Sequence, residues 1–180
     1  HVAKMYPTLA SNPDYTSLVA ERHVDRMQGY LDDAEKKGAK LHVVNPANEK
    51  FTRESKKMAP VLLTGVTDEM TVMQDEIFGP LLPVMPYDSL AQVIDYVNDH
   101  PRPLALYVFD NDGGKVDRVL KETISGGVSV NDIALHYVPE DLPFGGVGAS
   151  GMGHYHGYEG FSTFSKMRPV RAARCFRRSR

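Results

Sequence analysis

Residues 73–84 read MQDEIFGPLLPV, a stretch in which two adjacent carboxylates and an aromatic side chain precede a Gly-Pro pair and an apolar run. Pro80 fixes its own φ and disfavours the α region for Gly79, while Gly79 supplies backbone freedom, so we predict that the chain turns after Phe78. The apolar run at 81–85 predicts a buried strand. A carboxylate on such a turn can accept a hydrogen bond from a sugar hydroxyl, and an aromatic face beside it can pack on a flat ring.

This turn also has a purely structural interpretation. In it, Asp75 and Glu76 are solvated turn residues and Phe78 fills the core, as most side chains of these types do. On these residues alone the structural interpretation is the more common one, and both stay open.

Strand and helix patterns alternate along the rest of the chain. The predicted strands are 41–44, 60–64, 81–85, 104–109 and 127–130, and the predicted helices are 21–37, 90–98 and 115–122. Ser89 and Gln92 form a capping-box pattern before the second helix, and Val116, Val119 and Leu120 form the inward face of the third. The order strand, helix, strand, helix, strand from 81 to 130 is typical of right-handed βαβ crossovers. We therefore predict an α/β fold with a mainly parallel sheet and flanking helices.

Ligands of such a sheet gather outside the carboxyl ends of its strands. Asn131 and Asp132 follow the last predicted strand at that end, and the loop that they open continues through His136 to Phe144. This loop is therefore a second candidate site.

Four further motifs follow the turn in order. They read PLALY at 103–107, GGVSVND at 126–132, LPFGGVGASGMG at 142–153, and YHG with FSTFS between 155 and 165. Together with QDEIFGP at 74–80 they resemble the class-3-like branch of the aldehyde dehydrogenase superfamily, whose members are longer than this chain. The resemblance runs over residues 14–170 and covers the later part of the family pattern, so it implies an incomplete catalytic domain of the aldehyde dehydrogenase type. Residues 1–13 are then an irregular lead-in and residues 171–180 a basic tail.

The resemblance also implies a reaction and roles for individual residues. The reaction is oxidation of an aldehyde, which we expect to be aromatic, such as coniferaldehyde, to its acid through a cysteine thiohemiacetal, with NAD or NADP as hydride acceptor. Glu76 would hydrogen-bond the nicotinamide ribose, Phe78 would pack beside the nicotinamide, and Phe144 would line the aldehyde tunnel. We expect Asn131 and His136 to bind substrate as well. A homodimer or homotetramer is the default assembly.

The resemblance assigns no catalytic residue to this chain. The family's nucleophile and general-base glutamate belong to motifs upstream of the matched ones, and the chain begins at His1 rather than Met, so we expect an excised or processed piece that is inactive alone. The alternative is a non-enzymatic oligomerisation or ligand-binding module on the same fold.

Three other features carry no function in our interpretation. Residues 146–151 satisfy G-x-G-x-x-G, but they follow no strand and lead into further glycines rather than a helix. No acidic residue lies about 20 residues on, as a dinucleotide site requires, so we predict a glycine turn. His154 and His156 fall short of a metal-ligand set. Cys175 lies among arginines beyond every matched motif, and we predict an incidental surface thiol rather than a nucleophile.

Composition bounds the remaining possibilities. The 180 residues carry 21 basic and 23 acidic side chains, a net charge of −2, which favours neither nucleic acid nor an anionic membrane as partner. No apolar run has the length of a membrane span. One cysteine excludes an internal disulfide and is compatible with a reducing compartment, so we expect a cytoplasmic protein without a metal site.

Overall fold

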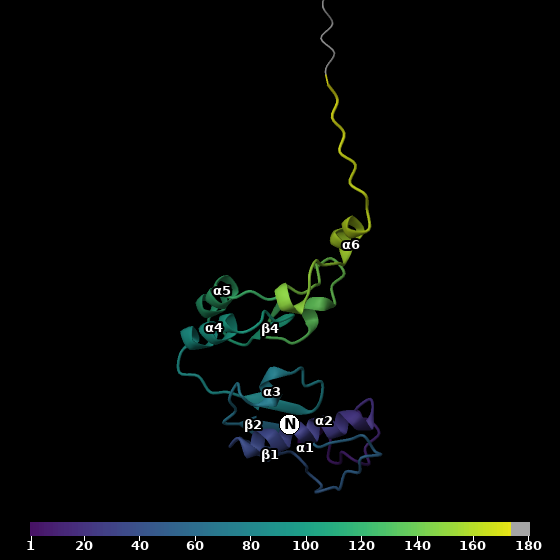
Figure 1. Cartoon of the computed structure of the whole chain (residues 1–180), viewed down its shortest axis with the longest axis vertical. Coiled ribbons are helices and arrows are strands. Elements are labelled where there is room, and N and C mark those ends of the chain that lie inside the picture. Colours follow the sequence, from purple (N-terminus) through teal and green to yellow (C-terminus); the bar gives the residue numbers. More distant parts are fainter. Residues whose placement is uncertain (174–180) are drawn as a thin grey trace, which may run out of the picture. The chain divides into compact units, whose positions relative to one another are not determined.

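The structure is a computed structural model that describes residues 1–173. Cys175 and most of the predicted basic tail lie outside the described residues. The chain divides into two compact units, residues 1–86 and the residues from 87 onward (Figure 1). Within residues 1–173 no helix is both long and apolar enough to cross a bilayer.

The first unit is built on a three-stranded sheet. Its elements are α1 (Val2–Met5), α2 (Glu21–Lys36), β1 (Lys40–Val43), β2 (Val61–Thr64), α3 (Thr71–Gln74) and β3 (Leu81–Val84). The strand order is β1-β2-β3, with β1 antiparallel to β2 and β2 parallel to β3. The register pairs Val61 with both Val43 and Leu81.

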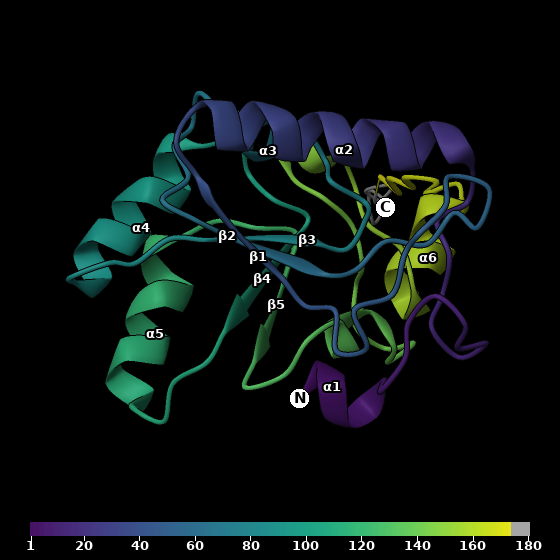
Figure 2. The ribbon, with the colours of Figure 1, turned by 90° about the horizontal axis from the view of Figure 1, so that it is seen from below.

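Helix α2 covers one face of this sheet (Figure 2). Its buried residues are Met27, Tyr30, Leu31 and Ala34, which recur at the spacing that aligns side chains on one side of a helix. They pack with Val61, Leu63 and Leu81 of the sheet in one hydrophobic core. The helix predicted over residues 21–37 is confirmed.

Strand β3 differs from the prediction of a fully buried strand. Leu81 is buried, but Leu82 and Val84 are 58% and 41% exposed. Successive side chains of a strand point to opposite faces, and α2 covers only the face of Leu81.

The first thirteen residues have more structure than an irregular lead-in. Pro7 follows the short helix α1, and the segment after it is tied to the unit by two charged side chains. The carboxylate of Glu49 accepts hydrogen bonds from the main-chain N–H groups of Leu9, Ala10 and Ser11, which hold the pKa of Glu49 below its usual value. Lys57 Nζ donates to three carbonyl oxygens of the same segment.

The second unit contains one βαβ crossover rather than the run predicted from residue 81, because β3 belongs to the sheet of the first unit. Its elements are α4 (Leu90–Asp99), β4 (Ala105–Val108), α5 (Gly113–Glu122), β5 (Gly127–Val130), the short 3-10 helices η1 (Leu135–Tyr137) and η2 (Gly148–Ser150), and α6 (Gly157–Thr163). Strands β4 and β5 are parallel, with Leu106 opposite Val128, and α5 connects them. Helices α4 and α5 lie side by side (Figure 1).

Two details of these helices differ from expectation. Ser89 caps α4 by accepting from the Gln92 N–H at 3.3 Å, but Gln92 Oε1 accepts from the N–H of Asp88, so the reciprocal bond falls one residue before the predicted one. On α5, Val119 is buried as predicted, whereas Leu120 is 44% exposed and does not face inward. Adjacent positions of a helix point about 100° apart, so Leu120 lies at the edge of the apolar stripe.

Candidate functional site

The loop between α3 and β3 presents the first pair of predicted site residues. Glu76 is exposed, and among residues 1–173 its carboxylate makes no hydrogen bond or ion pair. Phe78 is 74% exposed and has a φ of 46°, in the left-handed region that side-chain-bearing residues rarely adopt. The interpretation in which Phe78 fills the core is therefore wrong, and both side chains are available to a ligand.

Helix α2 holds this loop through two side chains, Arg26 and Tyr30. Arg26 donates from Nη1 to the carbonyl of Glu76 at 3.1 Å and from Nη2 to the carbonyl of Ile77 at 2.9 Å. The Tyr30 hydroxyl donates to Asp75 Oδ2 at 3.0 Å, and burial, followed by this hydrogen bond, raises the pKa of Tyr30. The loop is thus fixed at three consecutive residues.

Gly79 serves this loop differently from the sequence-based expectation. The positive φ falls on Phe78 and not on Gly79. A Cβ at Gly79 would overlap the sulfur of Met27, which is fully buried beneath it. Glycine here therefore serves the close approach of the loop to α2 rather than backbone freedom.

An ionised carboxylate anchors the segment just before the loop. Asp33 of α2 accepts from the N–H and the hydroxyl of Thr71, at 2.8 and 3.0 Å, at the start of α3. Lys37 forms an ion pair with the same carboxylate. Lys37 and then the Thr71 N–H lower the pKa of Asp33 from 3.8 to about 2.

A groove opens beside Phe78 within the first unit. It encloses about 600 Å³ and is lined by Phe78 together with Thr16, Ser17, Leu18, Val19 and His23. Its walls combine an aromatic ring and aliphatic side chains with two hydroxyls and an imidazole. A surface of this kind suits a flat ring joined to a hydroxylated group.

The second unit places Asn131 at the carboxyl end of β5, as predicted. Its amide is used by the main chain of Asp110, which follows β4: the Asp110 N–H donates to Asn131 Oδ1, and Asn131 Nδ2 donates to the Asp110 carbonyl, both at 3.0 Å. Asn131 has a φ of 55°, which asparagine tolerates better than most residues. Asn131 therefore ties the ends of the two parallel strands together, and its contact with substrate stays a prediction.

Phe144 lies in an aromatic cluster. Its ring centroid is 6.1 Å from that of His136, 5.8 Å from that of Tyr155 and 6.0 Å from that of His156, and its main chain pairs with that of Tyr155. His136 Nδ1 is 3.2 Å from Ser129 Oγ, and its Nε2 is buried without a partner among the described residues. The structure thus brings His136 and Phe144 together, while their role in substrate binding stays a prediction.

The glycine-rich segment at 146–151 is a turn, as predicted. It contains η2, a single 3-10 turn, with a φ of 63° at Gly148. A Cβ at Gly146 would overlap the main chain of Ser150, so the glycine there permits a close chain reversal. A dinucleotide fingerprint requires an α-helix that starts within the glycine-rich segment, and none starts here.

His154 pairs with Glu159 at 3.0 Å on the exposed side of the second unit. Within the described part of the chain, no three His, Cys, Asp or Glu side chains are grouped so that they could hold a metal ion.

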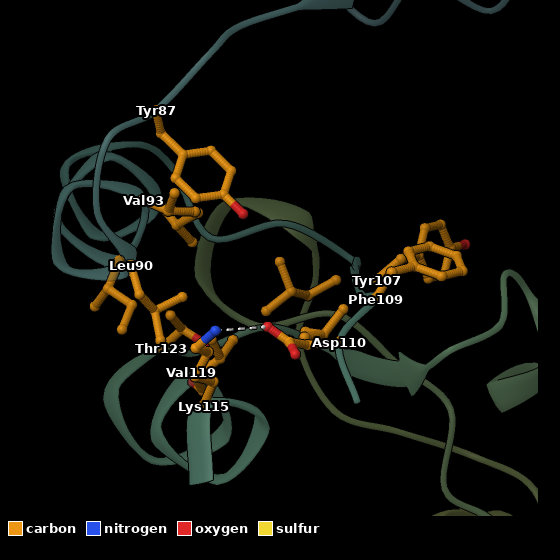
Figure 3. A pocket seen from close by; sticks show the side chains of 13 residues that line it. Tyr87, Leu90, Val93, Tyr107, Phe109, Asp110, Lys115, Val119 and Thr123 are labelled. Atoms are coloured by element: carbon orange, nitrogen blue, oxygen red, sulfur yellow. Dashed lines mark hydrogen bonds and ion pairs between the residues drawn. The ribbon is translucent and has the colours of Figure 1, made fainter. Parts of the chain in front are cut away.

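A smaller pocket of about 190 Å³ lies between α4, α5 and the end of β4 (Figure 3). Leu90, Val93 and Val119 line its apolar wall, and Lys115 and Asp110 face each other across it at 3.7 Å. Its lining is mostly that of a helix–sheet core with one ion pair at the rim. None of the predicted site residues lines this pocket.

The sequence motif pointed to Glu76 and Phe78 but not to the residues of α2 that hold their loop. Arg26 and Tyr30 lie on α2, far from the loop in sequence. The only signal in the sequence was the position of Arg26 next to Met27, an apolar residue of the helix.

Comparisons with known proteins test the family resemblance. The sequence matches the model of the aldehyde dehydrogenase family over residues 2–170. It is 54% identical over 159 residues to a probable coniferyl aldehyde dehydrogenase of Caulobacter vibrioides, covering 88% of this chain and 33% of that protein. It is 51% identical over 170 residues to a coniferyl aldehyde dehydrogenase of a Pseudomonas species, covering 94% and 35%. The chain thus spans about a third of the length of these relatives.

Solved structures show the same fold. A substrate-bound AldH of Staphylococcus aureus is 34% identical with a TM-score of 0.79, over 96% of this chain and 38% of that one. A Mycobacterium tuberculosis aldehyde dehydrogenase complexed with NAD+ is 30% identical with a TM-score of 0.72, over 83% and 30%. These likenesses confirm the family resemblance and the fold class inferred from the sequence motifs.

Proposed function

Because this chain belongs to the aldehyde dehydrogenase family, we propose that it forms part of an enzyme that oxidises an aldehyde to its carboxylic acid with NAD or NADP. The observation that carries this proposal is the anchored loop of the first unit. On it an unengaged carboxylate and an exposed aromatic ring lie two residues apart beside a groove.

The residues of this loop fit a nicotinamide nucleoside. The carboxylate of Glu76 can accept hydrogen bonds from the ribose hydroxyls, and the ring of Phe78 can pack beside the nicotinamide. Bound there, the cofactor would supply the hydride acceptor. Glu76 and Phe78 act by binding and orienting, so we assign neither of them a proton-transfer or nucleophilic role.

We place the aldehyde at the aromatic cluster of the second unit. Phe144 would line its path, with His136 and Asn131 as further substrate contacts. We propose an aromatic substrate such as coniferaldehyde, supported by the relatives that carry coniferyl aldehyde dehydrogenase in their names. We also propose a cytoplasmic homodimer or homotetramer, and we expect no turnover from these 180 residues alone.

The role of Glu76 is tested by Glu76→Ala in the full-length protein. We expect turnover to fall about 10- to 100-fold, because a misplaced nicotinamide slows hydride transfer steeply. NADH or NADPH formation with coniferaldehyde is the assay. Glu69→Ala is the matched control, since it removes another exposed carboxylate of the first unit.

Two results would contradict the proposal. Turnover by Glu76→Ala equal to that of the unaltered protein would remove Glu76 from the cofactor site. A folded full-length protein that reduces neither NAD nor NADP with any aldehyde would instead favour the non-enzymatic module.

A further inference from the structure

We propose that Arg26 is a positioning residue that sets the direction of the Glu76 and Phe78 side chains from α2. The proposal rests on the proposed function, since it assigns a purpose to the loop that we place at the cofactor. Arg26 itself need not touch the cofactor, because it acts through the main chain of the loop.

The geometry of the guanidinium is specific for this task. Its two terminal nitrogens donate to the consecutive carbonyls of Glu76 and Ile77, at 3.1 and 2.9 Å. These carbonyls belong to the peptide planes on either side of Ile77. Fixing both planes fixes where the chain leaves Glu76 and where it enters Phe78.

The backbone conformation of Phe78 needs such support. Phe78 has a φ of 46°, and an exposed side chain gains little packing that would hold it in the left-handed region. The main-chain bonds to Arg26 immediately precede it. We infer that they keep Phe78 in this conformation, with its ring facing the groove of Thr16, Ser17 and His23.

The guanidinium is itself held in place. Its central carbon lies 5.6 Å from the centre of the Tyr30 ring, within the range of a cation–π contact. The Tyr30 hydroxyl in turn donates to Asp75, the residue before Glu76. Arg26 Nε is buried without a partner among the described residues, a cost that a merely solvated arginine would not carry.

Lysine could not replace this arrangement fully. Arginine offers a planar fork whose parallel N–H groups reach two neighbouring acceptors, whereas the lysine ammonium is a single mobile point of charge. Arg26→Lys should therefore restore part of the loop order that Arg26→Met removes.

The test reads loop order without any cofactor. These 180 residues contain no tryptophan, so Phe78→Trp adds one fluorophore at the exposed loop position, and the signal of the full-length protein that keeps Phe78 is subtracted as background. In the Phe78→Trp protein we expect Arg26→Met to lower the fluorescence anisotropy and to raise acrylamide quenching about twofold, and Arg26→Lys to lie between. Arg22→Met, which removes an exposed charge from the same helix, should change neither.

A second readout uses turnover in the protein that keeps Phe78. We expect Arg26→Met to lower kcat about tenfold or more with a smaller change in the aldehyde KM, since misorientation acts on hydride transfer. A merely structural role would lower the amount of folded enzyme without separating kcat from KM, and circular dichroism measures that amount.

The outcomes distinguish the two proposals. Unchanged anisotropy in Arg26→Met overturns the positioning role, and so does unchanged kcat in Arg26→Met when Glu76→Ala is slow. Lower anisotropy with full turnover in both Arg26→Met and Glu76→Ala supports the anchoring of the loop and overturns its assignment to the cofactor.

Discussion

Replacing Gly79 with alanine should destabilise the first unit through Met27. The added Cβ would overlap the Met27 sulfur, and Met27 is fully buried, so its side chain has little space into which it can move. Overpacking of this kind costs about 1–3 kcal/mol. Because Gly79 does not have a positive φ, alanine recovers about 0.4–1 kcal/mol by restricting the unfolded chain. The net expectation is a loss of about 1–2 kcal/mol in the free energy of unfolding.

Urea unfolding followed by far-ultraviolet circular dichroism measures this loss. Gly29→Ala is the matched control, because an alanine Cβ at this position of α2 meets no atom within 4 Å and should stabilise the helix by about 0.5–1 kcal/mol. A Met27→Ala background removes the overlapping atom, so Gly79→Ala should cost less there. If Gly79→Ala were neutral, or cost the same in both backgrounds, contact with Met27 would not be the reason for glycine.

Two further predictions concern stability. The pKa of Asp33 in the folded protein, about 2, lies below the ordinary 3.8, so the bonds of its ionised form to Lys37 and Thr71 add stability at and above pH 4 that is lost as the pH falls toward 2. Measurements of the free energy of unfolding at decreasing pH should show this loss. Asp33→Asn should make that free energy less dependent on pH between 4 and 2. Asn131→Ala should lower the free energy of unfolding by about 2 kcal/mol, because it removes both hydrogen bonds to Asp110 and leaves alanine at a φ of 55°, whereas Asn131→Gly should lower it less. Equal losses of the two variants in urea unfolding would show that the backbone conformation is not the cause.

The elements of the fold could be predicted because their signals are local. The stripe of Met27, Tyr30, Leu31 and Ala34 repeats at helical spacing, and the helix forms where that stripe can be buried. β4 and β5 pair in parallel across α5, a connection long enough for such a crossover, whereas β3 and β4, also separated by a helix, lie in different sheets. For α2 and for the pair of β4 and β5 the pattern and the packing agree, so the sequence was sufficient there.

The direction of β1 and the uncovered face of β3 were not local properties. β1 runs antiparallel to β2, and the sequence of the loop between them gives no signal of this pairing. The apolar run at Leu81 predicted burial on both faces, which parallel strands usually have, yet α2 covers only one. Which surface meets a strand depends on the elements around it, and no periodicity within the strand encodes that.

The loop at Glu76 departs from what local sequence preferences favour. An exposed phenylalanine in the left-handed region is unfavourable both for solvation and for the backbone, and glycine at that position would avoid both costs. Departures of this kind are expected at functional sites, where other parts of the fold hold them in place. The residue that holds this one, Arg26, is 50 positions away from Glu76, so the motif could indicate a site while giving no information about its support.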